Sequence, residues 1–135
     1  MTRVLYDTNV VLDVLLKREP FLALSTAALN AAAEQVEGFI AAHAVTTVAY
    51  MLQRSLGAQE TRSTVARLLS RLKVAAVADS TIRSALLAGT ADFEDAVCYA
   101  AGQEAAIDVI VTRDPAGFAV STIPALAPEA FLATL

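Results

Sequence analysis

Residues 109–112 read Val-Ile-Val-Thr, a continuous β-branched run of the kind that is buried on both faces of a parallel sheet. A second apolar run, Val-Leu-Tyr at residues 4–6, ends at the polar turn of residues 7–9, which favours the start of a helix. Residues 39–41 and 74–78 predict two further strands. Longer segments with helical spacing separate these runs. The alternation predicts an α/β fold with a mainly parallel sheet flanked by helices.

The helical segments are marked by apolar periodicity and by residues that start or stop helices. Pro20 suits the first position of a helix, and Gly57 suits the end of one. The clearest periodicity lies in the segment that begins at residue 59, where apolar residues recur at i, i+3, i+4 and i+7. The predicted helices cover residues 10–16, 20–35, 45–56, 59–72, 81–88, 92–104 and 128–135.

Composition favours one folded domain over residues 1–135, because 56% of the residues are hydrophobic and 18% are charged. The longest stretch without a charged residue, Gly38–Gln53, falls short of the ~20 apolar residues that a membrane span needs. Lone Cys98 allows no internal disulfide, which fits the expectation of a cytoplasmic protein. The net charge of −4 argues against a protein that simply coats nucleic acid.

Four aspartates occupy positions where a parallel sheet places a binding crevice, outside the carboxyl ends of the strands. Asp7 directly follows the first predicted strand, and Asp114 follows the run at residues 109–112. Asp92 and Asp95 lie three residues apart in the first turn of a predicted helix and share one face, whereas Glu94 is predicted to point elsewhere. If the strands are neighbours, these four carboxylates converge.

Each aspartate also has a structural explanation. Asp7 can cap the helix that follows it, the segment 92–95 resembles a capping box, and Asp114 before Pro115 suits a type I turn. Convergence is harder to explain in this way, because carboxylates within ~4–6 Å repel one another unless a cation compensates them. An oxygen-rich site of this kind suits Mg²⁺ or Mn²⁺.

The other polar residues carry weaker signals. His43 is the one histidine and is predicted to have an ordinary packing or surface role. Asp13 is expected to cap or to face solvent, and Cys98 is expected to be a small buried hydrophobe. A phosphoryl-accepting domain built on Asp7 fits poorly, since it needs a late lysine and no lysine follows Lys73.

Three segments resemble the signatures of PIN-domain ribonucleases. They are DTNVVLD at residues 7–13, DFEDAV at residues 92–97, and residues 110–118, which begin with IVTRD and end at Phe118. The likeness is to the branch of VapC-type toxins that carry DFEDA at this position. The segments occur in family order and extend over essentially the whole chain. The resemblance implies a PIN-like three-layer sandwich and a metal-dependent endoribonuclease, the toxin of a toxin–antitoxin pair.

The resemblance also assigns residue roles. The resemblance implies that three aspartates at family acidic positions are catalytic and bind one or two Mg²⁺ or Mn²⁺ ions. A fourth aspartate, particular to this branch, is implied to bind the metal as well. These residues are Asp7, Asp95 and Asp114, with Asp92 as the further metal ligand. Asn9 and Thr112 match supporting polar positions, and Arg113 is a candidate contact for a substrate phosphate. RNA as substrate, an antitoxin partner and a homodimer are expected.

One departure from the family pattern bears on activity. PIN nucleases usually carry a glutamate in the helix after the second strand, where this chain has Val48 or Ala49. Either Asp92 substitutes for it in space, or the site binds metal weakly, or catalysis has been lost. The alternative reading is therefore a weak or inactive PIN-fold binding module. A second difference is Gly117, where many relatives have an aspartate.

Overall fold

A five-stranded sheet forms the centre of the computed structural model, which describes residues 1–90 and 92–135. The strand order is β3-β2-β1-β4-β5, and each neighbouring pair is parallel. The strands are β1 (Arg3–Tyr6), β2 (Glu37–Ala41), β3 (Lys73–Ala75), β4 (Val109–Val111) and β5 (Ala125–Leu126). The predicted parallel α/β sheet is therefore confirmed.

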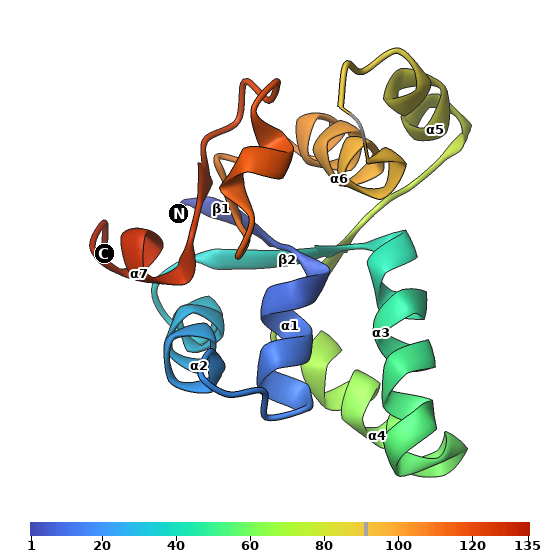
Figure 1. Ribbon diagram of the computed structural model, residues 1–135, viewed down its shortest axis with the longest axis vertical. Coiled ribbons are helices and arrows are strands. Elements are labelled where there is room, and N and C mark those ends of the chain that lie inside the picture. The colour runs from blue at the N-terminus through green and yellow to red at the C-terminus, as the bar shows by residue number, and fades with distance from the viewer. Residues whose placement is uncertain (91) are drawn as a thin grey trace.

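Helices cover both faces of this sheet (Figure 1). The α-helices are α1 (Thr8–Leu15), α2 (Leu22–Asn30), α3 (Ala42–Leu56), α4 (Ala58–Leu69), α5 (Asp79–Leu86), α6 (Phe93–Glu104) and α7 (Pro128–Leu132), with 3₁₀ turns at Ala31–Ala33 and Pro115–Phe118. Figure 1 shows α1 to α4 on one side of the sheet and α5 and α6 on the other. The predicted three-layer arrangement is confirmed.

The layers follow from the path of the chain. From β1 the chain moves outward to β2 and β3, and then it returns past β1 to form β4. Crossover connections between parallel strands are right-handed. When the chain reverses its direction across the sheet, the helices α5 and α6 of the return connection therefore lie on the face opposite to the earlier helices. The return also makes β4 the direct neighbour of β1, with Tyr6 opposite Val111.

The centre of the core lies around β1. Val4, Leu5 and Tyr6 are almost completely buried. The Tyr6 hydroxyl donates a 2.8 Å hydrogen bond to the carbonyl of Ala28 in α2, which satisfies the one polar atom of that ring. The strand that leads to Asp7 is therefore held from both faces of the sheet.

Element boundaries differ from the sequence prediction at several points. The helix predicted over residues 20–35 is shorter, because α2 ends at Asn30 and a 3₁₀ turn follows it. Helix α3 begins directly after β2, three residues earlier than predicted. The two-residue strand β5 was not predicted, since a strand of that length leaves no periodic pattern. Among the described residues, no helix is both long and apolar enough to cross a membrane.

Candidate metal and nucleic-acid site

Asp7 lies at the carboxyl end of β1, at the point where the chain's direction across the sheet reverses. Its side chain is 6% exposed. One carboxylate oxygen accepts a 2.8 Å hydrogen bond from the Thr8 N–H at the start of α1, and the other accepts a 2.7 Å hydrogen bond from the Thr112 hydroxyl. Asp7 thus caps helix α1, as one interpretation of the sequence predicted. Its hydrogen bonds also hold the carboxylate in a fixed orientation at the carboxyl ends of the strands.

Thr112 and Asn9 connect the ends of β1 and β4. Besides donating to Asp7, the Thr112 hydroxyl accepts hydrogen bonds from the Asp114 N–H at 3.1 Å and the Asn9 amide at 3.4 Å. The Asn9 amide oxygen accepts a 3.2 Å hydrogen bond from the Arg113 N–H. Both residues therefore lie where the supporting polar groups were predicted.

Helix α6 brings the second group of carboxylates over the end of β1. Asp92 is its N-cap and accepts a 3.1 Å hydrogen bond from the Asp95 N–H. Asp7, Glu94 and Asp95 each offer an oxygen, and these three atoms lie within 4.8 Å of one another. The prediction that Glu94 points elsewhere is wrong: the helix begins so close to Asp7 that both adjacent side chains reach it.

Asp114 and Asp92 border the same site from its other side. A cavity of about 360 Å³ is lined by both residues together with Asp95 and Gly117. A Cβ atom at Gly117 would lie 2.7 Å from an oxygen of Asp95 and 3.2 Å from one of Asp114, so the glycine leaves room for both carboxylates. The four predicted aspartates therefore converge, with Asp92 and Asp114 outside the tight group formed by Asp7, Glu94 and Asp95.

Burial and the crowding of negative charge shift the pKa values of the cluster. Burial, followed by the charges of Asp7, Asp92 and Glu94, raises the pKa of Asp95 from 3.8 to about 7. Burial also raises the pKa of Asp7, and the hydrogen bond from Thr112 opposes that rise. Such a group of carboxylates is costly to ionise on its own, and a cation between them removes the cost.

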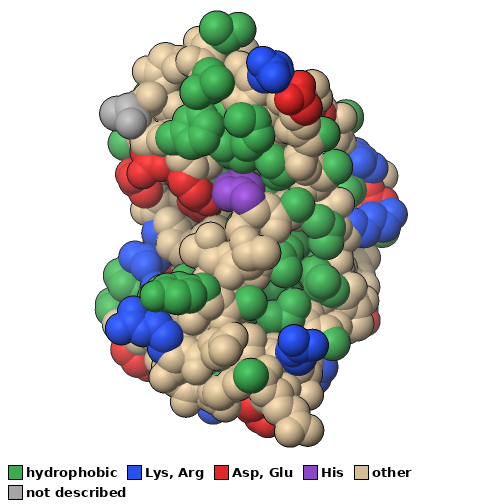
Figure 2. All heavy atoms as spheres, turned by 90° about the vertical axis from the view of Figure 1, so that its right-hand side faces the viewer, with side chains coloured by type: hydrophobic (Ala, Val, Ile, Leu, Met, Phe, Trp, Pro, Cys, Tyr) green, Lys and Arg blue, Asp and Glu red, His purple; other side chains and the backbone are tan. Residues whose placement is uncertain are grey.

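His43, at the start of α3, contacts Glu94. Its Nε2 lies 3.1 Å from Glu94 Oε1, and this hydrogen bond lowers the pKa of Glu94. Figure 2 shows the one histidine side chain at the surface beside a group of acidic side chains. Cys98 is buried, as predicted, and its Sγ lies 3.4 Å from Glu94 Oε1. His43 thus lies at the surface, one of the two roles expected for it, and its contact with Glu94 joins it to the acidic group.

The glutamate that the family pattern places in α3 has no carboxylate substitute on that helix near the site. Val48 is completely buried in the core. What α3 adds instead is His43, through its contact with Glu94, and Thr47, which lines the cavity beside Asp7. Glu94, which comes from α6, supplies the third carboxylate of the tight group, whereas Asp92, the expected substitute, lies outside that group.

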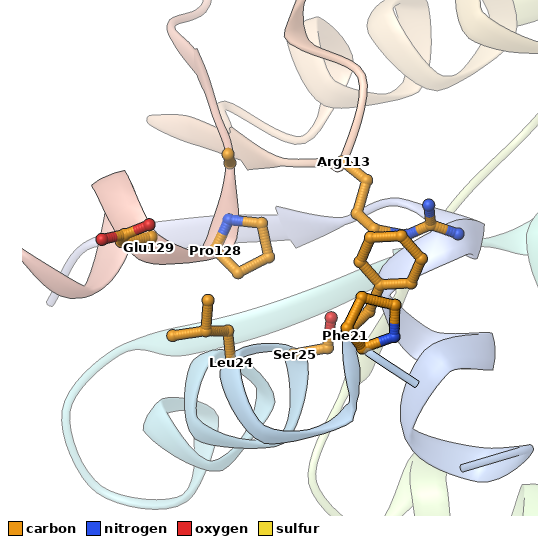
Figure 3. A pocket seen from close by; sticks show the side chains of 8 residues that line it. Phe21, Leu24, Ser25, Arg113, Pro128 and Glu129 are labelled. Atoms are coloured by element: carbon orange, nitrogen blue, oxygen red, sulfur yellow. The ribbon is translucent and has the colours of Figure 1, made fainter. Parts of the chain in front are cut away.

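Arg113 is engaged in the fold. Its Nε lies 2.7 Å from a carboxylate oxygen of Asp13, which is completely buried, and its guanidinium stacks 3.9 Å from the centre of the Phe21 ring (Figure 3). The expectation that Asp13 caps or faces solvent is wrong. A buried carboxylate requires a paired cation, so Arg113 serves Asp13 before any substrate phosphate.

Comparison with known proteins agrees with this geometry. A family model described as PIN domain matches residues 3–116. No match was found among curated proteins. The solved structure of VapBC2 from Rickettsia felis, bound to promoter DNA, is similar with a TM-score of 0.72 and 14% identity, over 93% of this chain and 97% of that one.

Two further structures share the fold. A toxin–antitoxin complex from Klebsiella pneumoniae gives a TM-score of 0.68 at 20% identity, over 93% of this chain and 97% of that one. The VapC20 toxin of Mycobacterium tuberculosis, described as cleaving the sarcin–ricin loop, gives 0.63 at 15% identity, over 79% of this chain and 86% of that one. Because the family model spans most of the sequence, this chain belongs to the PIN domain family.

Proposed function

We propose that this chain is an endoribonuclease that depends on Mg²⁺ or Mn²⁺ and acts as the toxin of a toxin–antitoxin pair. The observation that carries the proposal is the convergence of Asp7, Glu94 and Asp95, whose oxygens lie within 4.8 Å of one another at the carboxyl ends of the strands. Membership of the PIN domain family and the likeness to the VapC toxins support it.

The donor set fits a hard divalent cation. Every ligand atom that the Asp7, Glu94 and Asp95 group offers is a carboxylate oxygen, which is the donor that Mg²⁺ and Mn²⁺ prefer. Burial raises the pKa of Asp95, the neighbouring carboxylates raise it further, and a cation in the group would oppose both effects. Asp92 and Asp114 border the adjoining cavity, and we propose that they contribute to a second ion or to the hydration shell of the first.

The residues of the site divide the work of phosphodiester hydrolysis. Asp7, Glu94 and Asp95 would hold a divalent cation, which would supply positive charge to neutralise the phosphate oxygens and would make a water molecule more acidic. Thr112 and Thr8 hold the Asp7 carboxylate in one orientation. Cys98 is excluded as a nucleophile, because burial keeps the pKa of its thiol well above the usual value and the thiol therefore stays protonated. We propose a water molecule as the attacking group.

The proposed partners follow from the relatives. The similar structure from Klebsiella pneumoniae is described as a toxin–antitoxin complex, which supports a small antitoxin as the partner of this chain. RNA is the proposed substrate, as the description of VapC20 suggests. The homodimer and the cytoplasmic location remain predictions, and sedimentation of the purified chain tests the first of them.

Cleavage of a mixed RNA substrate with Mn²⁺, with Mg²⁺ and with chelator tests the proposal. We expect cleavage with either metal, none with chelator, and a loss of at least about 100-fold in Asp95→Asn and Glu94→Gln. Glu60→Gln, which removes an exposed carboxylate on α4, is the matched control and retains the wild-type rate. Equal rates in the three variants would overturn the proposal.

The same cleavage experiment distinguishes the proposed nuclease from the alternative, a binding module. The buried Val48 in place of a family glutamate favours a binding module with the PIN fold and little activity. Such a module binds RNA without cleaving it, whatever the metal. Stabilisation by Mn²⁺ together with the absence of cleavage would identify the chain as that module.

A further inference from the structure

A second group of metal-ligating atoms adjoins the carboxylate cluster. His43 Nε2, Glu94 Oε1 and Cys98 Sγ come from the start of α3 and from two successive turns of α6. Nε2 and Oε1 are 3.1 Å apart, Sγ and Oε1 are 3.4 Å apart, and Sγ and Nε2 are 3.6 Å apart. The group of Asp7, Glu94 and Asp95 offers carboxylate oxygens alone, so the two groups differ in chemistry.

These distances match the edges of a tetrahedron around zinc. With Zn–N and Zn–O bonds of ~2.0–2.2 Å and a Zn–S bond of ~2.3 Å, tetrahedral angles put ligand atoms about 3.3–3.6 Å apart. The three observed separations lie within about 0.3 Å of these values. Mg²⁺ and Mn²⁺ take oxygen ligands and disfavour a thiolate, whereas zinc accepts nitrogen, oxygen and sulfur together.

We propose that His43, Glu94 and Cys98 form a zinc site that shares Glu94 with the group of Asp7 and Asp95. Three protein ligands leave one tetrahedral position open to water. The histidine lies at the surface beside the acidic side chains, so an ion reaches the site from that side (Figure 2). On binding, the Cys98 thiol releases its proton to solvent and its sulfur becomes a thiolate ligand.

Two features limit the affinity of this zinc site. Loss of the thiol proton is opposed by burial, which raises the pKa of Cys98, although a bound cation reverses that preference. The other ring nitrogen of His43, Nδ1, is buried without a hydrogen-bond partner. Zinc-bound histidines usually hold a partner there, and its absence costs about 10–100-fold in affinity. The site is thus suited to reversible occupancy rather than to a permanent structural zinc.

Shared use of Glu94 makes the two sites competitive. Zinc bound by His43 and Cys98 draws the Glu94 carboxylate toward itself and places a second dication next to the position between Asp7 and Asp95. Zinc therefore weakens Mn²⁺ binding and inhibits the nuclease. The inhibition rests on the proposed function, whereas the zinc site itself does not.

Cobalt is the probe that reports thiolate ligation, because Co²⁺ replaces zinc and a thiolate–cobalt bond gives a charge-transfer absorption. We expect one equivalent of Co²⁺ to produce this band in the wild type and one equivalent of Zn²⁺ to remove it. Cys98→Ser abolishes the band and His43→Gln weakens Co²⁺ binding at least about tenfold. Asp95→Asn, which removes no ligand of the zinc site, retains the band.

The zinc dependence of RNA cleavage tests the coupling. We expect the zinc concentration for half-inhibition, relative to each variant's own zinc-free rate, to rise at least about tenfold in His43→Gln. Where Cys98→Ser disturbs the buried packing, His43→Gln on the surface side carries the same test. Absence of the cobalt band from a wild type that Mn²⁺ stabilises would overturn the zinc site alone. A band in a chain that cleaves no RNA would overturn the proposed function alone.

Discussion

Replacing Asp95 by asparagine is expected to stabilise the metal-free protein. The pKa of Asp95 rises from 3.8 to about 7 because the site is partly desolvated and three other carboxylates face it. The folded state therefore holds this proton more tightly than the unfolded state does. As pH rises from about 4 to about 7, the wild type loses stability, and above pH 7 the loss is complete. The asparagine side chain carries no charge, so the variant escapes this loss.

The size of the effect follows from the shift. A shift of ~3 units corresponds to ~4 kcal/mol at most, at ~1.36 kcal/mol per unit. Asp95 is only partly buried, so solvent screening reduces the expected gain to ~1–2 kcal/mol. For a chain of 135 residues this corresponds to a rise in Tm of about 3–8 °C. If Asp95 served only the start of α6, its replacement would instead cost ~0.3–1 kcal/mol.

Thermal unfolding with chelator at pH 5 and pH 8 is the assay. Asp95→Asn should exceed the wild type clearly at pH 8 and less at pH 5. Adding Mn²⁺ should reverse the order, because an ion at 100 times its Kd adds ~2.7 kcal/mol to the wild type and little to the variant. Glu60→Gln should track the wild type within ~0.5 kcal/mol throughout. An Asp95→Asn variant that melts at or below the wild-type temperature at pH 8 would refute the reasoning.

Two further substitutions test neighbouring features. Arg113→Ala should lower the free energy of unfolding by ~3–5 kcal/mol in urea titrations, because it leaves buried Asp13 unpaired, and adding Asp13→Asn should recover most of the loss. Unchanged stability would show that Asp13 does not need Arg113, and Arg113 would then be available to contact a substrate phosphate. Gly117→Ala should weaken Mn²⁺ binding at least about fivefold, or ~1 kcal/mol, in thermal-shift titrations, since its methyl group displaces the Asp95 carboxylate. Wild-type Mn²⁺ affinity would show that Asp95 has room to move.

The framework of the site could be predicted from the sequence. β-branched and apolar runs marked β1 and β4, and parallel strands with their carboxyl ends at one edge bring Asp7 beside Thr112. The N-cap position of Asp92 followed from local helix signals, which depend on neighbours in the chain.

Side-chain partners across the fold could not be predicted in the same way. Helical periodicity separates Glu94 from Asp95 by about 100° around the helix axis, which suggested different surroundings. Helical periodicity contains no information on how closely α6 approaches Asp7. Because α6 begins close to Asp7, the carboxylates of Glu94 and Asp95 both reach the site. Likewise, no local pattern connects Arg113 with Asp13, which come together only through the packing of α1 against the end of β4.

The pairing of β1 with β4 determines when the site can form during synthesis of the chain. The hydroxyl that orients Asp7 belongs to Thr112, 105 residues further along the chain, and the other two carboxylates of its group lie at residues 94 and 95. A ribosome-bound chain that has released only its first hundred residues holds an incomplete centre. The site is therefore complete only after β4 and Thr112 have been synthesised and have joined β1 in the sheet.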